Sequence, residues 1–397
     1  MQVIALRQCL RFQNFQKKIH DHLITFQTRV SCFQLPSKVP KKQAASSIHS
    51  GLAPDDLLKI YRAMILTRAF DTKVLSLQRQ GRLGAYINCT GEEGAIVPSA
   101  FALEKEDWMF TSYREVGAHI VRGLSIDLMF AQLFGNSSDL LKGRQMSNSW
   151  GSRELHIVPT AAPIGAYLPV AVGVAMGMKI KKKNNLAVLA YMGDGGTSSS
   201  DFHVAMNFAG VFKVPIVFIC RNNGWAISLP VSKQSASETL AIKARAYGFE
   251  GIRIDGNDAL TVYETTKKAL DKARTGGGPT LIETLTYRIG AHSTSDDPTR
   301  YRDSKEAELW SLKDPIAILR KNLVGRKILN EKIEEKLSQE VSEIVARAAK
   351  SQEEIPLLPP EKLIFDDVYA ELSRDLLEQR DELLNLEKTN SRNRTDN

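Results

Sequence analysis

Two short turns carry the residues whose types and spacing best suggest chemistry. Residues 193–197 read GDGGT, residues 221–225 read RNNGW, and each stretch directly follows an apolar run of strand length. Asp194 offers a carboxylate, Asn223 an amide oxygen and Trp225 a backbone carbonyl. Mg²⁺ takes six oxygen ligands, so two diphosphate oxygens and a water would complete this set. The pair of turns therefore predicts metal-assisted binding of a diphosphate.

The glycines of the first turn support the same interpretation. Gly193, Gly195 and Gly196 would let the backbone approach a phosphate, while the helix that follows would direct N–H groups at it. Either turn alone is typical of an ordinary loop. The intervening residues 196–221 have room for one helix and one strand, however, which would place both turns at one sheet edge. A dinucleotide fingerprint would need glycine where Ser198 stands, and no Walker A lysine pattern occurs.

Alternating strand and helix patterns surround these turns. Continuous apolar runs predict buried strands, and amphipathic stretches between them predict helices, so we expect an α/β fold with a doubly wound, mostly parallel sheet. In such sheets, ligands bind at the carboxyl ends of the strands. The predicted strands are 186–192, 215–220, 250–255 and 279–286; the predicted helices are 53–81, 91–102, 115–122, 125–134, 202–212 and 260–274. From residue 304 to 386 the chain is charged and helical, and we expect 365–386 to be a docking helix.

Composition divides the chain into three parts. We predict a basic tail at 1–50, an α/β domain at 51–325 and a helical C-terminal region at 326–397. The tail has eight Lys/Arg against one acid, a charge of +7, which leaves +1 of the total +8 for residues 51–397. This nearly neutral body argues against a nucleic-acid partner. The tail fits a mitochondrial presequence, a disordered extension or a start codon placed too early.

Cysteine usage and hydropathy exclude other classes. The four cysteines are far apart and form no C-x-x-C pair, which suits a reducing compartment and offers neither a disulfide framework nor a zinc site. Residues 157–178 carry no charge but contain three prolines, so we expect a buried loop leading into a core helix. The sequence predicts no membrane span.

The two turns together resemble the thiamine-diphosphate motif of the alpha subunits of 2-oxo acid dehydrogenases, closest to the branched-chain type. The resemblance extends from about residue 52 to 386. It is also carried by GEEG at 91–94, YRE at 113–115, KGRQM at 142–146 and the run from Tyr287-Arg288 to HSTSDD at 292–297. It implies the thiamine-diphosphate-binding fold, with thiamine diphosphate and Mg²⁺ as cofactors.

The resemblance also implies roles for particular residues. Tyr113, Arg114 and Arg221 would contact the diphosphate, which suits a guanidinium fork. Ile164 would lie near the cofactor and suit an apolar substrate side chain. His292 would lie beside the reacting carbon, where it could steer the substrate carboxylate or transfer protons. Ser293 matches a serine that a dedicated kinase phosphorylates in mitochondrial relatives, where a phosphate would disturb the loop by repulsion.

The implied activity is oxidative decarboxylation of a branched-chain 2-oxo acid, with reductive acylation of a lipoyl-bearing acyltransferase. It implies a beta subunit in an alpha-two beta-two heterotetramer, without which the chain would be inert. A pyruvate dehydrogenase alpha subunit and a non-catalytic scaffold paralogue are the alternatives. The loop at 161–167 lacks the side-chain oxygens of the potassium site in branched-chain members, so no monovalent cation site is expected. The DDPTRYR run favours a bacterial cytoplasmic protein over one of the mitochondrial matrix.

Overall fold

The computed structural model describes residues 51–159, 161–183 and 185–395. The predicted basic tail at 1–50 lies outside them. A six-stranded sheet has the order β2-β1-β3-β4-β8-β7, and all its neighbouring strands are parallel. The strands are β1 Trp108–Phe110, β2 Ile157–Val158, β3 Val188–Gly193, β4 Ile216–Asn222, β7 Glu250–Asp255 and β8 Thr280–Leu285. The expected parallel α/β sheet is confirmed.

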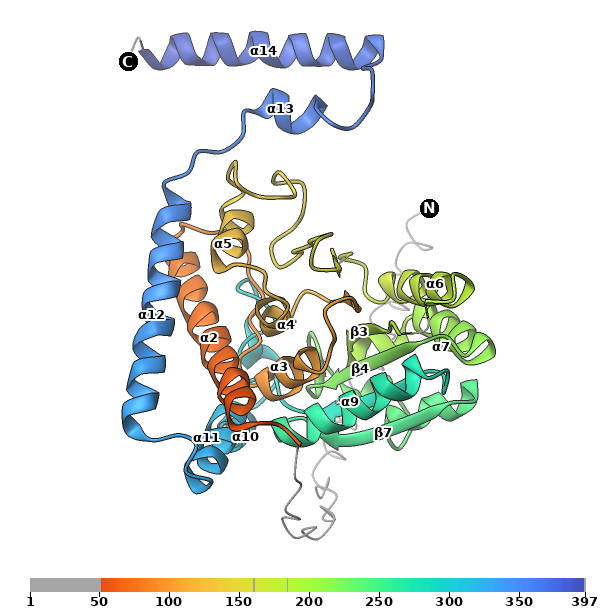
Figure 1. The fold of residues 1–397 in the computed structure, drawn as a ribbon. Helices are drawn as coiled ribbons and strands as arrows, with labels where there is room; N and C mark the ends of the chain where they lie inside the picture. Colours follow the sequence, from red (N-terminus) through yellow and green to blue (C-terminus); the bar gives the residue numbers. More distant parts are fainter. Residues whose placement is uncertain (1–50, 160, 184, 396–397) are drawn as a thin grey trace, which may run out of the picture. The chain divides into compact units, whose positions relative to one another are not determined.

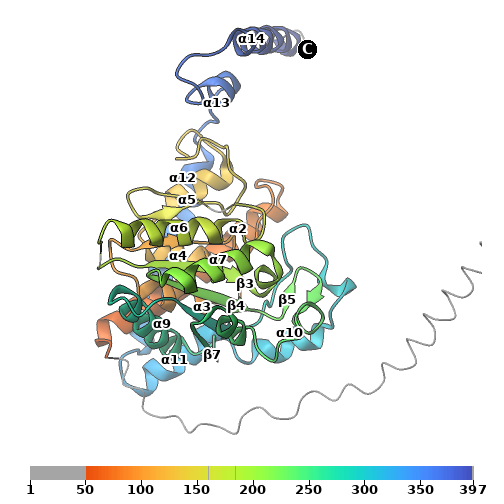
Figure 2. The same cartoon turned by 90° about the vertical axis from the view of Figure 1, so that its right-hand side faces the viewer.

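Helices cover both faces of this sheet (Figures 1 and 2). Successive side chains of a strand point to opposite faces, so a central strand contributes side chains to two cores. Leu189 and Tyr191 of β3 pack in a core with α2 Pro54–Arg79, α3 Glu93–Phe101, α5 Ile126–Phe134 and α9 Ala259–Arg274. Val188 and Ala190 pack in a second core with α6 Tyr167–Ile180 and α7 Ser200–Phe212. This double covering explains the continuous apolar runs in the sequence.

Hydroxyl and carboxyl caps begin several of these helices. Ser199 accepts a hydrogen bond from the Phe202 N–H at the start of α7, and Asp258 accepts from two N–H groups at the start of α9. Ser125 caps α5 in the same way, and Gly135 ends that helix in the left-handed conformation. Because α7 follows the GDGGT turn directly, its cap fixes the end of that turn.

The charged C-terminal part forms several helices. They are α10 Ser304–Ser311, α11 Pro315–Gly325, α12 Glu331–Glu353, α13 Pro360–Phe365 and α14 Arg374–Thr395. Buried side chains of α12, including Val341, Val345 and Ala348, join the same core as α2 and α5. Asn136 also donates to the backbone and side-chain oxygens of Gln352 in α12. The boundary at 325/326 remains a prediction, although α12 shares a core with the sheet domain.

The single helix predicted at 365–386 is wrong. α13 ends at Phe365, and α14 begins only at Arg374. Asp367 has a φ of +66°, which a continuing helix does not allow, and Asp is a weak helix former. Arg144 donates to the backbone carbonyls of Leu363 and Asp366, so a side chain and not a further helical turn satisfies these groups.

The remaining elements are short. They are α4 Val116–Val121, β5 Trp225–Ala226, β6 Leu229–Pro230, α8 Val231–Gln234 and the 3-10 turns η1 Asp194–Ser198, η2 Ala241–Tyr247 and η3 Pro298–Arg300. Cys89 and Cys220 are buried free thiols. Among the helices of the described residues, none has the length and apolar character that a bilayer crossing requires.

Candidate active site at the carboxyl edge of the sheet

The two turns predicted to act together are adjacent in the structure. β3 and β4 pair directly, with Gly193 opposite Arg221, so GDGGT and NNGW continue from neighbouring strands at one edge. Gly195 lies so close to the second turn that a Cβ added there would be 2.8 Å from the Cβ of Ala226. Only glycine fits at this contact without a shift of one turn. The spacing argument made from the sequence therefore holds in three dimensions.

Asp194 is a buried carboxylate at the start of η1, with 2% of its surface exposed. Gln234 of α8 donates from Nε2 to its Oδ2 at 2.7 Å. Burial raises the pKa of Asp194 to about 6, more than this hydrogen bond lowers it. The carboxylate is thus short of positive charge, and a divalent cation would supply it.

Asn223 and Trp225 complete the expected donor set. The side chain of Asn223 is buried, and its Oδ1 accepts from the Trp225 N–H at 3.2 Å. The Trp225 carbonyl accepts from Nη1 of Arg288 at 3.3 Å, and its second lone pair can still take a cation. The described part of the chain has no group of three or more His, Cys, Asp or Glu side chains arranged to hold a metal ion. A site built from one carboxylate, one amide and one carbonyl fits Mg²⁺ with diphosphate oxygens better than zinc.

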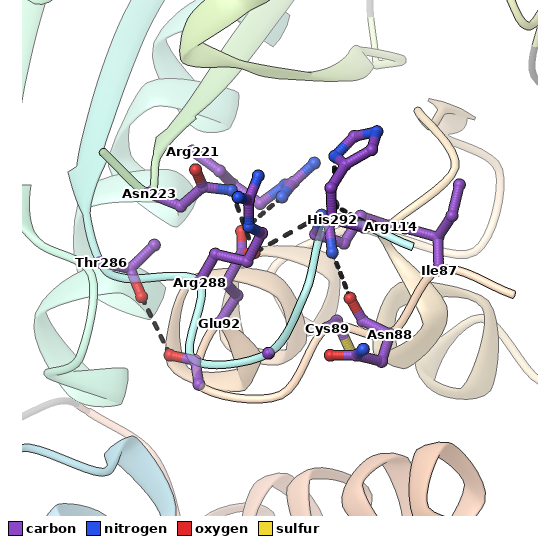
Figure 3. Close-up of polar contacts among 12 residues, drawn as sticks. Ile87, Asn88, Cys89, Glu92, Arg114, Arg221, Asn223, Thr286, Arg288 and His292 are labelled. Carbon is purple, nitrogen blue, oxygen red and sulfur yellow. Dashed lines mark hydrogen bonds and ion pairs between the residues drawn. The ribbon is translucent and has the colours of Figure 1, made fainter. Parts of the chain in front are cut away.

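A buried ion cluster contacts Asn223 of this donor set, and Figure 3 shows its residues Glu92, Arg114 and Arg221 beside Asn223. Arg221 donates from Nε to Glu115 at 2.6 Å and from Nη1 to Glu92 at 2.5 Å, while its Nη2 donates to Ser112 at 3.0 Å and contacts Glu115. The glutamate side chains are fully buried, and that of Arg221 is 2% exposed. Burial lowers the pKa of Arg221, but the two carboxylates outweigh it and raise the pKa above its usual value. The carboxylates of Glu92 and Glu115 therefore take most of the N–H donors of this guanidinium.

Glu92 links this cluster to the donor set. Its Oε1 accepts from Nδ2 of Asn223 at 3.1 Å and lies 3.5 Å from Nε of Arg114. One carboxylate therefore contacts Asn223, Arg114 and Arg221. Glu92 is the N-cap residue of α3. The GEEG stretch is one of those that carry the family resemblance, but nothing in its sequence indicates which arginines Glu92 contacts.

Arg114 fixes the position of His292. Its Nη2 donates to the His292 backbone oxygen at 3.0 Å and lies 3.2 Å from Nδ1, while Nη1 donates to the Asn88 carbonyl. Because a guanidinium only donates, Nδ1 must accept and Nε2 carries the hydrogen. Burial, followed by the nearby charges of Arg114 and Arg288, lowers the pKa of His292 to about 4. The imidazole is neutral near pH 7.

Tyr113 packs against both groups. Its ring lies 5.9 Å from that of His292 in an edge-on arrangement, and the Arg114 guanidinium carbon lies 5.9 Å from its centroid. Burial raises the pKa of the Tyr113 hydroxyl. The structure therefore brings Tyr113, Arg114 and His292 together.

The loop after His292 is held by a chain of polar contacts. Asp296 accepts from the His292 N–H at 2.7 Å and from the Tyr301 hydroxyl at 2.5 Å, and Tyr301 accepts from Arg288 at 2.8 Å. Ser293 is half-buried in this loop. A phosphate on Ser293 would be only a few residues from Asp296, so the two negative charges would repel each other.

The remaining predicted residues lie around the first turn. Gly193 ends β3, Gly195 and Gly196 lie in η1, and Ile164, 41% exposed, has Cγ2 3.7 Å from where a Cβ on Gly196 would stand. Gln234, Glu115 and Glu92 were not singled out for roles from the sequence. Their partners are distant in the chain, so no local pattern could have identified them.

Comparison with known proteins agrees with this geometry. Residues 61–361 match the family described as the dehydrogenase E1 component. The chain is 44% identical over 327 residues to the mitochondrial 2-oxoisovalerate dehydrogenase subunit alpha of Caenorhabditis elegans, covering 82% of this chain and 75% of that protein. Its counterpart in Bos taurus is 41% identical over 333 residues, covering 84% and 73%. The subunit alpha 2 of Arabidopsis thaliana is 42% identical over 335 residues, covering 84% and 70%. The chain belongs to the dehydrogenase E1 component family, among the alpha subunits of branched-chain 2-oxo acid dehydrogenases.

Proposed function

We propose that the chain is the alpha half of an enzyme that oxidatively decarboxylates 2-oxoisovalerate and related branched-chain 2-oxo acids. The observation that carries the proposal is the adjacency of Asp194 and Asn223 at the carboxyl edge of β3 and β4. This donor set suits a Mg²⁺ ion that anchors the diphosphate of thiamine diphosphate. When bound, thiamine diphosphate supplies the electron sink for loss of carbon dioxide.

The protein's own groups would bind and orient the cofactor. Asp194, Asn223 and the Trp225 carbonyl would hold the metal, and Arg114 and Tyr113 would face the diphosphate. Arg221 would contribute less directly, because Glu92, Glu115 and Ser112 take most of its five N–H donors. Among the contacts of the described residues, the second Nη1 hydrogen of Arg221 is the one left for a phosphate oxygen.

His292 would act on the substrate as a neutral hydrogen-bond donor. With Nδ1 facing Arg114, the Nε2–H is the group left to meet a substrate carboxylate or a reacting oxygen. Arg114 and Asp296 hold the backbone on either side of the ring, so the imidazole keeps one orientation. We propose that phosphorylation of Ser293 would act by disturbing these contacts.

The partners follow from the same assignment. A beta subunit would complete the active site in an alpha-two beta-two heterotetramer, and a lipoyl-bearing acyltransferase would receive the acyl group. The expectation of a bacterial cytoplasmic protein finds no support among the relatives, which are named as mitochondrial. We therefore propose the mitochondrial matrix as the location, in keeping with the basic composition of residues 1–50.

The test is co-expression with the beta subunit from the same genome, followed by steady-state assays. We expect kcat/KM to be higher with 2-oxoisovalerate than with pyruvate, and acyl groups to appear on a lipoyl domain. A preference for pyruvate would move the chain to the pyruvate branch. Absence of decarboxylation with either acid, in a complex that binds thiamine diphosphate, would indicate a non-catalytic paralogue.

A further inference from the structure

Two contacts determine which way the Asn223 carboxamide is turned at the metal site. An amide has one acceptor oxygen and one donor NH₂, and either could point at a given neighbour. Here Glu92, a carboxylate in an ion pair with Arg221, can only accept, so the amide atom facing it at 3.1 Å must be nitrogen. The Trp225 N–H can only donate, so the atom facing it at 3.2 Å must be oxygen.

We propose that Glu92 is a positioning residue that orients the Asn223 carboxamide so that its oxygen is presented to the metal ion. The proposal rests on the proposed function, because it deepens the assignment of Asn223 as a metal ligand. Glu92 does not touch the metal itself. It acts through the amide, as outer partners of metal ligands commonly do.

Burial makes this orientation strongly preferred. Glu92 is fully buried, and Asn223 is 4% exposed, so water cannot satisfy a misplaced donor or acceptor. Turning the amide over would place its oxygen against the Glu92 carboxylate and its NH₂ against the Trp225 N–H. Two hydrogen bonds would become two repulsive contacts in a site shielded from water.

Glu92→Gln is the informative substitution, because it makes residue 92 able to donate. The Arg221 guanidinium keeps the oxygen of the new amide, since the positive charge attracts it. The new NH₂ then faces the Asn223 NH₂ donor against donor, and turning the Asn223 amide over would set that NH₂ against the Trp225 N–H. Neither orientation is satisfied, so the Asn223 oxygen is no longer held toward the metal. We expect the affinity for Mn²⁺, used as a spectroscopic probe, to fall by about 10–100-fold.

A paired substitution separates orientation from charge and folding. Glu92→Gln combined with Asn223→Asp exchanges the carboxylate and the carboxamide without changing net charge. The aspartate introduced at 223 accepts from the new NH₂ with one oxygen and offers the other to the cation, whichever way it turns. We expect this double variant to recover most of the lost Mn²⁺ affinity.

Glu115→Gln is the matched control. It removes the other carboxylate partner of Arg221, at 2.6 Å from Nε, but the Glu115 carboxylate accepts from Ser112 and Arg221 and not from Asn223 among the described residues. We therefore expect Glu115→Gln to lower the thermal stability while leaving Mn²⁺ affinity far closer to wild type than Glu92→Gln does.

The measurement is electron paramagnetic resonance titration of the cofactor-free heterotetramer with Mn²⁺ in the presence of thiamine diphosphate, with circular dichroism to confirm folding. Loss in Glu92→Gln with recovery in the double variant supports the proposal. Wild-type affinity in Glu92→Gln, failure of the double variant to recover, or an equal loss in Glu115→Gln would overturn it. Absence of Mn²⁺ binding by wild type would instead refute the metal site in the proposed function.

Discussion

Replacement of Arg221 by methionine tests whether this arginine is mainly a structural cation or mainly a phosphate ligand. In the structure, Arg221 separates two fully buried carboxylates, Glu92 and Glu115, and forms ion pairs with both. Arg221→Met leaves these charges facing each other, with Arg114 as the nearest cation, 3.5 Å from Glu92. Removing one partner of a buried ion pair costs about 3–5 kcal/mol, so we expect at least that loss in the free energy of unfolding.

The assay is chemical denaturation of the cofactor-free heterotetramer, repeated with Mg²⁺ and thiamine diphosphate. The loss should be nearly as large without the cofactor as with it, because both carboxylates belong to the protein. Arg62→Met is the control, since Arg62 pairs with Glu340 at a half-exposed position where the cost should be below about 1 kcal/mol. If Arg221→Met leaves the cofactor-free protein as stable as wild type and weakens only cofactor binding, the structural reasoning is refuted.

Three further predictions follow from single contacts. Asp194→Asn should stabilise the cofactor-free protein by up to about 3 kcal/mol at pH 8 while abolishing Mg²⁺ binding. Burial raises the folded-state pKa of Asp194 to about 6, above the usual 3.8, so the stability that Asp194 contributes is present below pH 3.8 and lost as pH rises through 6. A stability difference between wild type and Asp194→Asn that does not shrink toward pH 4 in denaturation curves would contradict this. Arg114→Leu should raise the pKa of His292 from about 4 toward 6.5 in an NMR titration, although burial still lowers it, and an unchanged value would exclude the Arg114 contribution. Asn136→Ala should cost about 1–3 kcal/mol in one unfolding transition, because it removes buried hydrogen bonds to Gln352 of α12; two separate transitions would show that α12 unfolds independently.

Much of the sheet could be predicted from the sequence. The run at 186–192 corresponds to β3, because a strand buried on both faces needs continuous apolar side chains. The prediction at 250–255 coincides with β7, an edge strand whose residues are exposed or half-buried. β1 and β2 were not predicted, since strands of three and two residues are too short to show a periodic pattern. The break between α13 and α14 was missed because it depends on contacts from Arg144, far away in the chain.

The candidate site was predictable only in its outline. Asp194, Asn223 and Trp225 follow apolar runs, so their place at one sheet edge could be derived from spacing alone. The ion cluster could not, because Glu92, Glu115 and Arg221 come from three separate segments and carry no mutual signal. Arg221 shows the difference most clearly. The family resemblance assigned it to the diphosphate, whereas the structure pairs it with the carboxylates of Glu92 and Glu115.

The central claim is that two neighbouring turns hold one hard cation. It can be tested most directly by anomalous scattering from crystals of the heterotetramer grown with Mn²⁺ and thiamine diphosphate. We expect one Mn²⁺ peak bound by Asp194, the Asn223 side-chain oxygen and the Trp225 carbonyl, with short metal–oxygen distances of about 2.0–2.2 Å, near those of Mg²⁺. A fully occupied cofactor whose metal is bound by other residues, or by none of these three, would contradict the account.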